Sequence, residues 1–177
     1  MSDKILIAYA TKWGTTGSIA KEIAGVFREG GVACDVRPAH EVESIEGYRA
    51  VVLGSPVYHG HLLGPAETFR QRHGAALAKV PRALFIVSLT MARPSKPAVE
   101  KLIQRTRRFV EEFRPADVGL FAGALDYANL GFFTRTLMKL MHIPQGDFRK
   151  SEIVRKWAKD VLPRLTPPTV SPPSLPS

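Results

Sequence analysis

The chain opens with Ile5-Leu6-Ile7-Ala8-Tyr9-Ala10-Thr11-Lys12-Trp13-Gly14-Thr15-Thr16-Gly17-Ser18, an apolar run followed directly by a polar segment with glycine and hydroxyl side chains. Residues 5–9 predict a β-strand, and residues 10–18 predict a loop. Apolar side chains at helical spacing in residues 19–27 predict a helix that ends near Gly30. A helix that begins after such a loop presents free N–H groups and the positive end of its dipole to an anion. The same loop is also compatible with an ordinary helix start capped by Ser or Thr.

The rest of the chain repeats this alternation of apolar runs and amphipathic segments. Further strands are predicted at residues 32–36, 50–53, 83–87 and 118–122. Further helices are predicted at residues 65–78, 97–113, 129–142 and 150–162. Because unbroken apolar strands that alternate with amphipathic helices form parallel sheets covered on both faces, the pattern predicts an α/β fold. It favours a doubly wound three-layer sandwich with a five-stranded parallel sheet in the order 2-1-3-4-5 and an extra helix after strand five.

The composition limits the class of protein. The 177 residues carry a formal net charge of +9, a pI of about 10.0 and 45% hydrophobic residues, which is enough for one domain with a core. We expect one domain at residues 1–164 and a disordered proline-rich tail at residues 165–177. The single cysteine, Cys34, excludes an internal disulfide and a cysteine-based metal cage, and we expect no metal. The apolar runs fall short of the ~20 residues of a spanning helix, and the sequence has no nucleic-acid-binding motif, so we expect a cytoplasmic protein without a nucleic-acid partner.

In a doubly wound sheet the ligand lies beyond the carboxyl ends of the strands, which singles out the loops after the first, third and fourth strands. In the second of these loops, residues 54–61, small residues let the backbone approach a flat ligand, and Tyr58 offers a ring for stacking. His59 is either an acid or base near neutral pH or a plain surface histidine. In the third loop, residues 88–93, hydroxyl groups could bond the polar edge of a heterocycle, and Arg93 could meet a carboxylate or only solvent.

Together these loops resemble those of the flavodoxin-like superfamily. Residues 11–16 resemble the loop that binds the phosphate of FMN, and residues 54–60 are similar to the loop that holds the flavin ring. Within the superfamily, an ordered series of segments is most similar to the menaquinone-dependent protoporphyrinogen oxidases, over roughly residues 4–164. The series consists of residues 58–61, 88–93, 113–115, 122–127, 135–141 and 147–150. The phosphate loop departs from the usual Thr-Gly-Asn-Thr pattern, since Trp13 precedes Gly14 and Thr15 takes the place of the asparagine.

The resemblance implies a flavodoxin-like fold and an FMN-dependent oxidoreductase, with protoporphyrinogen IX or another small redox substrate as donor and a quinone as acceptor. The flavin would carry the chemistry, which agrees with the absence of a Ser-His-Asp set or a carboxylate pair from the sequence. Basic residues that could orient the substrate's two propionates are Arg93, Arg135, Lys139 and Arg149. The residues that the resemblance assigns to FMN are Thr11, Lys12, Trp13, Gly14, Thr15, Thr16, Ser55, Pro56, Val57, Tyr58, His59, Gly60, Ser88, Leu89, Thr90, Met91, Gly123 and Ala124.

Two other functions remain open. The first is a flavodoxin-like electron carrier or an FMN-dependent quinone reductase with another donor, although a pI near 10.0 does not suit a carrier of the acidic type. The second is an interaction module with this fold and no flavin. A further alternative concerns residues 130–141, whose basic and apolar faces suit either peripheral docking at the inner face of the cell membrane or packing on the sheet.

Overall fold

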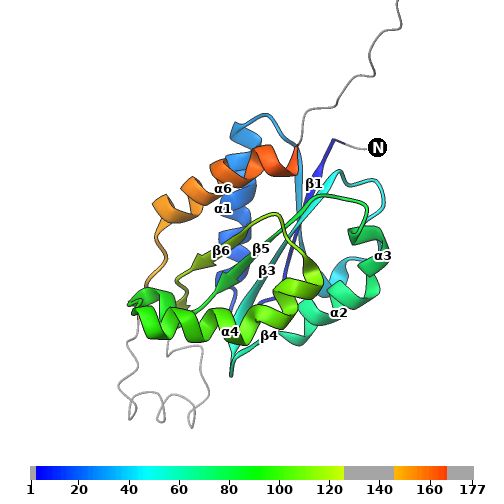
Figure 1. The fold of residues 1–177 in the computed structure, drawn as a ribbon. Helices are drawn as coiled ribbons and strands as arrows, with labels where there is room; N and C mark the ends of the chain where they lie inside the picture. Colours follow the sequence, from blue (N-terminus) through cyan, green and yellow to red (C-terminus); the bar gives the residue numbers. More distant parts are fainter. Residues whose placement is uncertain (1–2, 126–145, 167–177) are drawn as a thin grey trace, which may run out of the picture.

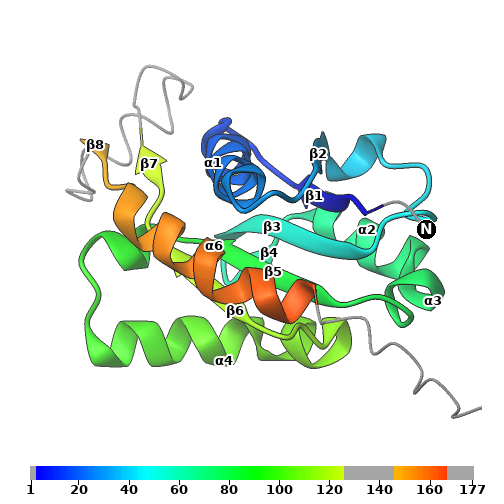
Figure 2. The ribbon, with the colours of Figure 1, turned by 90° about the horizontal axis from the view of Figure 1, so that it is seen from above.

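The computed structural model describes residues 3–125 and 146–166. In these residues the parallel strands form one sheet in the order β2-β1-β3-β5-β6 (Figures 1 and 2). Counted along the chain without the short antiparallel strand β4, this is the predicted order 2-1-3-4-5, which confirms the fold. The extra helix predicted at residues 129–142 lies outside the described residues. The strands are β1 (Ile5–Tyr9), β2 (Cys34–Pro38), β3 (Ala50–Tyr58), β5 (Arg82–Val87) and β6 (Val118–Phe121).

Helices cover both faces of this sheet. One face carries α1 (Thr15–Glu29) and α6 (Ser151–Leu165), which lie side by side (Figure 1). The other face carries η1 (Ala39–Glu41), α2 (Gly64–Arg72), α3 (Gly74–Leu77) and α4 (Lys96–Phe113). None of the helices in the described residues is long and apolar enough to cross a membrane.

The unbroken apolar strands follow from burial on both faces. In β1, Ile5 and Ile7 join the core under α1 and α6, while Leu6 and Ala8 join the core under α2 and α4. Successive side chains of a strand point to opposite faces, so burial on both faces favours an apolar residue at each position of such a strand. The central strands are held in parallel register, with Ile5 opposite Ala50 of β3.

The third strand is longer than predicted. Residues 54–58 were expected in a loop, but β3 continues through them and pairs with β5 as far as Pro56. It then turns back into β4 (His61–Leu62), which pairs antiparallel with its end. The turn consists of His59 and Gly60, both with positive φ, 50° and 88°. The loop prediction was wrong because glycine and proline usually end strands, whereas here both are accommodated in the middle of the sheet.

Other boundaries differ by a few residues. The second strand lies at residues 34–38 rather than 32–36, and as an edge strand it tolerates Pro38 at its end. The helix predicted at 65–78 is divided at His73, whose Nε2 lies 3.2 Å from the carbonyl oxygen of Val42. The last helix continues beyond its predicted end at 162, because the fully buried Leu165 anchors its final turn.

Three further short elements, which lie near the site, were not predicted. A 3-10 turn, η2 (Leu89–Ala92), follows β5. The strands β7 (Ala124–Leu125) and β8 (Gly146–Asp147) pair antiparallel outside the main sheet. These elements lie beyond the carboxyl ends of β5 and β6, where they frame the site described below.

Candidate functional site

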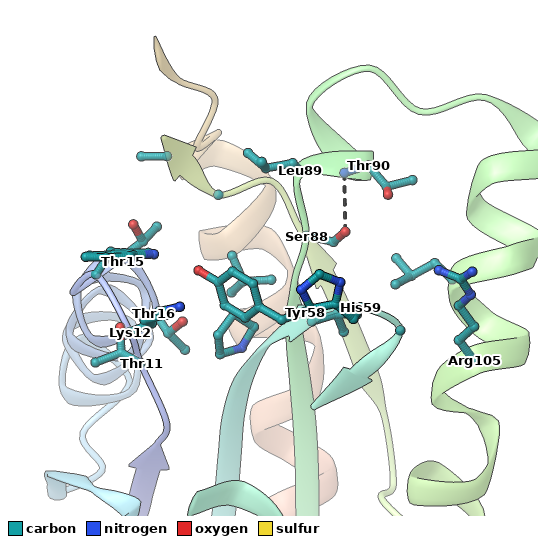
Figure 3. A pocket seen from close by; sticks show the side chains of 18 of the residues that line it. Thr11, Lys12, Thr15, Thr16, Tyr58, His59, Ser88, Leu89, Thr90 and Arg105 are labelled. Carbon is teal, nitrogen blue, oxygen red and sulfur yellow. Dashed lines mark hydrogen bonds between the residues drawn. The ribbon is translucent and has the colours of Figure 1, made fainter. Parts of the chain in front are cut away.

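A cavity of about 460 Å³ lies at the carboxyl ends of β1, β3 and β5 (Figure 3). This is the position at which the strand order of a doubly wound sheet reverses, and the volume is in the range of ligand sites in proteins. The cavity is lined by Thr11, Lys12, Trp13, Thr15, Thr16, Pro56, Val57, Tyr58, His59, Gly60, Val87, Ser88, Leu89, Thr90, Ala98, Lys101, Leu102, Arg105, Gly123 and Ala124.

One end of the cavity is the N-terminus of α1. Gly14 is the cap residue, with φ of 85°, and its N–H donates to Oγ1 of Thr11 at 2.8 Å. Thr15 and Thr16 form the first turn, which contains no acidic residue. The N–H groups of a first turn have no partners within the helix, so they point to a ligand as free donors beside the positive end of the dipole. The cap is thus a left-handed glycine and not the Ser or Thr side chain of an ordinary helix start.

The middle of the cavity is apolar and aromatic. The ring of Tyr58 is half-buried, and burial raises the pKa of its hydroxyl above the ordinary value of 10.0. The ammonium of Lys12 lies 5.5 Å from the centroid of this ring and 5.3 Å from that of Trp13. These distances are typical of cation–π contacts, which fix the lysine between the two rings. The indole of Trp13 remains 40% exposed at the rim.

The loop after β5 forms the upper edge of the cavity in Figure 3. Oγ of Ser88 accepts a hydrogen bond from the N–H of Thr90 at 3.2 Å, which starts the turn of η2 (Figure 3). The turn leaves the side chain of Leu89 exposed at the rim. Polar backbone groups and an apolar side chain thus face the same opening.

The opposite wall of the cavity is α4, which sequence reasoning missed. Ala98, Lys101, Leu102 and Arg105 line the cavity at the spacing i, i+3, i+4 and i+7, so they form one stripe of the helix. The i, i+3, i+4 and i+7 spacing was the only sign in the sequence that these four residues share one face of the helix. A sequence does not show which face of a helix borders a cavity, so the sequence alone does not distinguish the two cations, Lys101 and Arg105, from ordinary solvated charges.

The structure brings most of the predicted FMN residues together around the cavity, but three do not line it. Gly14 caps α1, and Met91 lies half-buried in η2. Ser55 is fully buried beneath the surface, where its Oγ accepts from the N–H of Leu63 at 3.0 Å and donates to the carbonyl oxygen of Pro56. Ser55 therefore holds β3 to the start of α2.

The two predicted substrate-binding residues that the structure describes, Arg93 and Arg149, do not line the cavity. Arg93 is exposed after η2. Arg149 forms an ion pair with Asp147 and donates to Oγ of Ser18 at 2.6 Å. The Arg149 guanidinium lowers the pKa of the Asp147 carboxyl. Arg135 and Lys139 lie outside the described residues.

The charge of the cavity is positive. Lys12, Lys101 and Arg105 line it, and no Asp or Glu among the described residues does so. The part of the chain that the structure describes also contains no group of His, Cys, Asp and Glu that could hold a metal ion. The arrangement therefore suits a flat ligand with anionic ends.

The chain is similar to known proteins of one family. The family described as Flavodoxin domain matches residues 6–151. Over 161 residues the chain is 30% identical to the protein named protoporphyrinogen IX dehydrogenase [quinone] of Escherichia coli (strain K12), covering 87% of this chain and 88% of that protein. It is 31% identical over 183 residues to the protein of the same name from Leishmania major, covering 94% and 79%. The resemblance stated from the sequence is thereby confirmed.

The fold is also that of solved flavodoxins. The crystal structure of oxidised flavodoxin 2 from Bacillus cereus superposes with a TM-score of 0.52 over 88% of this chain and 95% of that chain, at 20% identity. Since the family match extends over most of the sequence and the strand order agrees, this chain belongs to the flavodoxin domain family.

Proposed function

We propose that the protein is an FMN-dependent oxidoreductase that oxidises protoporphyrinogen IX to protoporphyrin IX and passes the electrons to a quinone. The observation that carries this proposal is a single cavity in which a helix N-terminus, an aromatic slot and a cationic wall meet. The names of the Escherichia coli and Leishmania major relatives supply the substrate and the acceptor. A quinone reductase with another donor would use the same cavity.

The residues present fit FMN. The first turn of α1 offers free N–H donors to a phosphate, with Thr11, Thr15 and Thr16 around it. Pro56, Val57 and Tyr58 provide one wall for a flat ring, and the loop after β5 provides backbone groups for its polar edge. At Gly123 a Cβ atom would lie 3.1 Å from Cγ1 of Val87, so the glycine keeps this side of the cavity open. Bound FMN would supply the redox chemistry, and the protein would supply position and environment.

The chain's own residues would act on the ligands by position and charge. Tyr58 keeps its proton at neutral pH and can donate a hydrogen bond from its hydroxyl. The exposed Trp13 and Leu89 at the rim would cover an apolar ring and exclude water from it. The positive charge of the cavity would favour a substrate with carboxylates over a neutral one.

The test is anaerobic oxidation of protoporphyrinogen IX by the purified protein with a menaquinone analogue. We expect a yellow protein with a flavin spectrum and a rate well above that of free FMN. A flavin-bound protein with no rate above free FMN would overturn the haem-precursor assignment and favour an electron carrier or a different quinone reductase. A preparation that stays colourless after incubation with FMN would instead favour the interaction module.

We also propose that the protein lies in the cytoplasm and associates peripherally with the inner face of the membrane through residues 130–141, on the basis of their sequence alone. The pair of changes Arg135→Gln and Lys139→Gln should weaken co-sedimentation with anionic vesicles, and high salt should remove the difference. The control pair Lys79→Gln and Lys159→Gln removes the same charge elsewhere. Equal losses from both pairs would contradict the proposal.

A further inference from the structure

We propose that Lys101 and Arg105 of α4 form a carboxylate-binding site that selects flat apolar molecules carrying carboxylates at their edge. The inference rests on the proposed function, because it concerns the substrate of the same cavity. It replaces Arg93 and Arg149, which do not line the cavity, as the cations that meet the substrate.

The first support is the composition of the helix face. Lys101 and Arg105 are one helical turn apart, and Ala98 and Leu102 stand beside them on the same stripe. The stripe thus alternates apolar contact area with cationic groups. Such a face complements a molecule with an apolar ring and acidic substituents, and it would be poorly suited to a ligand that is polar throughout.

The second support is that the salt bridges of the described residues include neither Lys101 nor Arg105, whereas Arg107 and Arg108 of the same helix are paired. Arg107 bonds Glu111 at 2.6 Å, and Arg108 bonds Glu112 at 3.0 Å. Glu111 and Glu112 are therefore engaged by other arginines, and neither of them lines the cavity. Lys101 and Arg105 remain exposed to solvent and can take an external anion without breaking an ion pair of the described structure.

The third support is that the fold positions Arg105. A Cβ atom at Gly60 would lie 2.8 Å from Cδ of Arg105, so the aliphatic stem of the arginine lies directly against the backbone of the β3–β4 turn. The turn can approach this closely because residue 60 is a glycine with φ of 88°. This contact restricts the conformations of the Arg105 side chain. Less conformational entropy is then lost when the guanidinium binds a carboxylate through paired N–H donors.

The fourth support is the separation of two anion sites within one cavity. Figure 3 shows Arg105 on one side and Thr15 and Thr16 on the other, with Tyr58 and His59 between them. A phosphate at the start of α1 therefore leaves the α4 wall unused. A second molecule that lies against the rim could place its carboxylates on this wall.

The test compares protoporphyrin IX with its dimethyl ester, which has the same ring and no free carboxylates. Dissociation constants would be measured by fluorescence titration with the flavin-loaded protein at low salt. We expect the wild type to prefer the diacid, and Arg105→Gln and Lys101→Gln each to weaken diacid binding about tenfold, as expected for loss of one hydrogen bond between charged groups. Binding of the ester should be unchanged, and Arg105→Lys should retain part of the preference.

Arg107→Gln is the matched control, because it removes a cation from the same helix away from the cavity. Flavin content and melting temperature of each variant would show that the fold is intact. Equal affinities of the wild type for diacid and ester, or an equal loss in Arg107→Gln, would overturn the site. A diacid preference that depends on Lys101 and Arg105, without any oxidation of protoporphyrinogen, would support the site and count against the proposed function.

Discussion

The ring of Phe85 lies directly against the backbone of Gly54, so closely that a Cβ atom at Gly54 would be 2.0 Å from Cζ of Phe85. The two residues are register partners on β3 and β5. The phenyl ring is fully buried and lies 6.0 Å from the ring of Phe121 and 6.5 Å from that of Trp157. The missing side chain at Gly54 therefore makes room for the aromatic cluster between the sheet and α6.

Gly54→Ala should destabilise the protein by about 3 kcal/mol, because the added methyl group overlaps a fully buried ring that cannot move freely. The measurement is urea unfolding followed by circular dichroism. Gly25→Ala is the control, since nothing lies within 4 Å of a Cβ atom there and Gly25 is inside α1. This control should stabilise the protein by up to about 1 kcal/mol. Equal stability of Gly54→Ala and the wild type would contradict the packing described.

Thr16→Asp should lower the affinity for FMN about tenfold or more, because it places a negative charge in the first turn of α1, where we propose that the phosphate binds. The side chain of Thr16 is buried, so Thr15→Asp, at a half-buried position, is tested in parallel. Fluorescence titration with FMN and with riboflavin separates the effects, since riboflavin has no phosphate. If both ligands lose affinity equally, the phosphate is not at this turn.

The buried thiol of Cys34 should make stability fall in alkaline solution. Burial raises its pKa from 9.0 to about 11. Above pH 9 the thiol ionises in the unfolded chain and stays protonated in the folded one, so its contribution is complete below pH 9 and is lost as the pH rises through 11. The difference in free energy of unfolding between the wild type and Cys34→Ala should shrink by about 2 kcal/mol between pH 8 and 11. A constant difference would contradict this.

Arg82→Met should destabilise the protein by about 3 kcal/mol, because the half-buried guanidinium donates to three carbonyl oxygens that would lose their partner. It bonds Leu77 at 2.6 Å, Val80 at 3.2 Å and also Phe113, and so joins the ends of α3 and α4 to β5. Arg107→Met, which removes only an exposed ion pair, should leave the stability nearly unchanged. Thermal and urea unfolding would compare the two, and similar losses would contradict the joining role of Arg82.

The strand order could be predicted because burial on both faces leaves an unmistakable pattern in the sequence. Ile5 and Leu6 of β1 belong to opposite cores, so both positions are apolar. Leu84 and Phe85 of β5 are divided between the two cores in the same way. The end of β3 could not be predicted in this way. At Gly54 the ring of Phe85 on β5 occupies the space that a side chain would need. These two residues are far apart in the sequence, so the local sequence around Gly54 does not show the contact.

The candidate site, too, could be predicted only in part from the sequence. The loops after β1, β3 and β5 were predicted from their place in the fold, and most of their residues line the cavity. Lys101 and Arg105 were missed, because their role depends on how α4 is rotated about its axis. Arg149 was given a substrate role that its ion pair with Asp147 does not favour, since a sequence does not show which charges pair with each other.

The packing of α1 against α6, the last helix of the described residues, affects how the molecule is made. α6 packs on α1 through fully buried side chains, and Leu162 lies so near Gly30 that a Cβ atom there would be 2.9 Å from its Cδ2. During synthesis on the ribosome, α1 therefore emerges long before α6 has been translated. The apolar face of α1 therefore stays exposed in the nascent chain until residue 165 has left the exit tunnel. Prematurely terminated chains lack α6, and we expect them to be bound by chaperones or degraded by proteases.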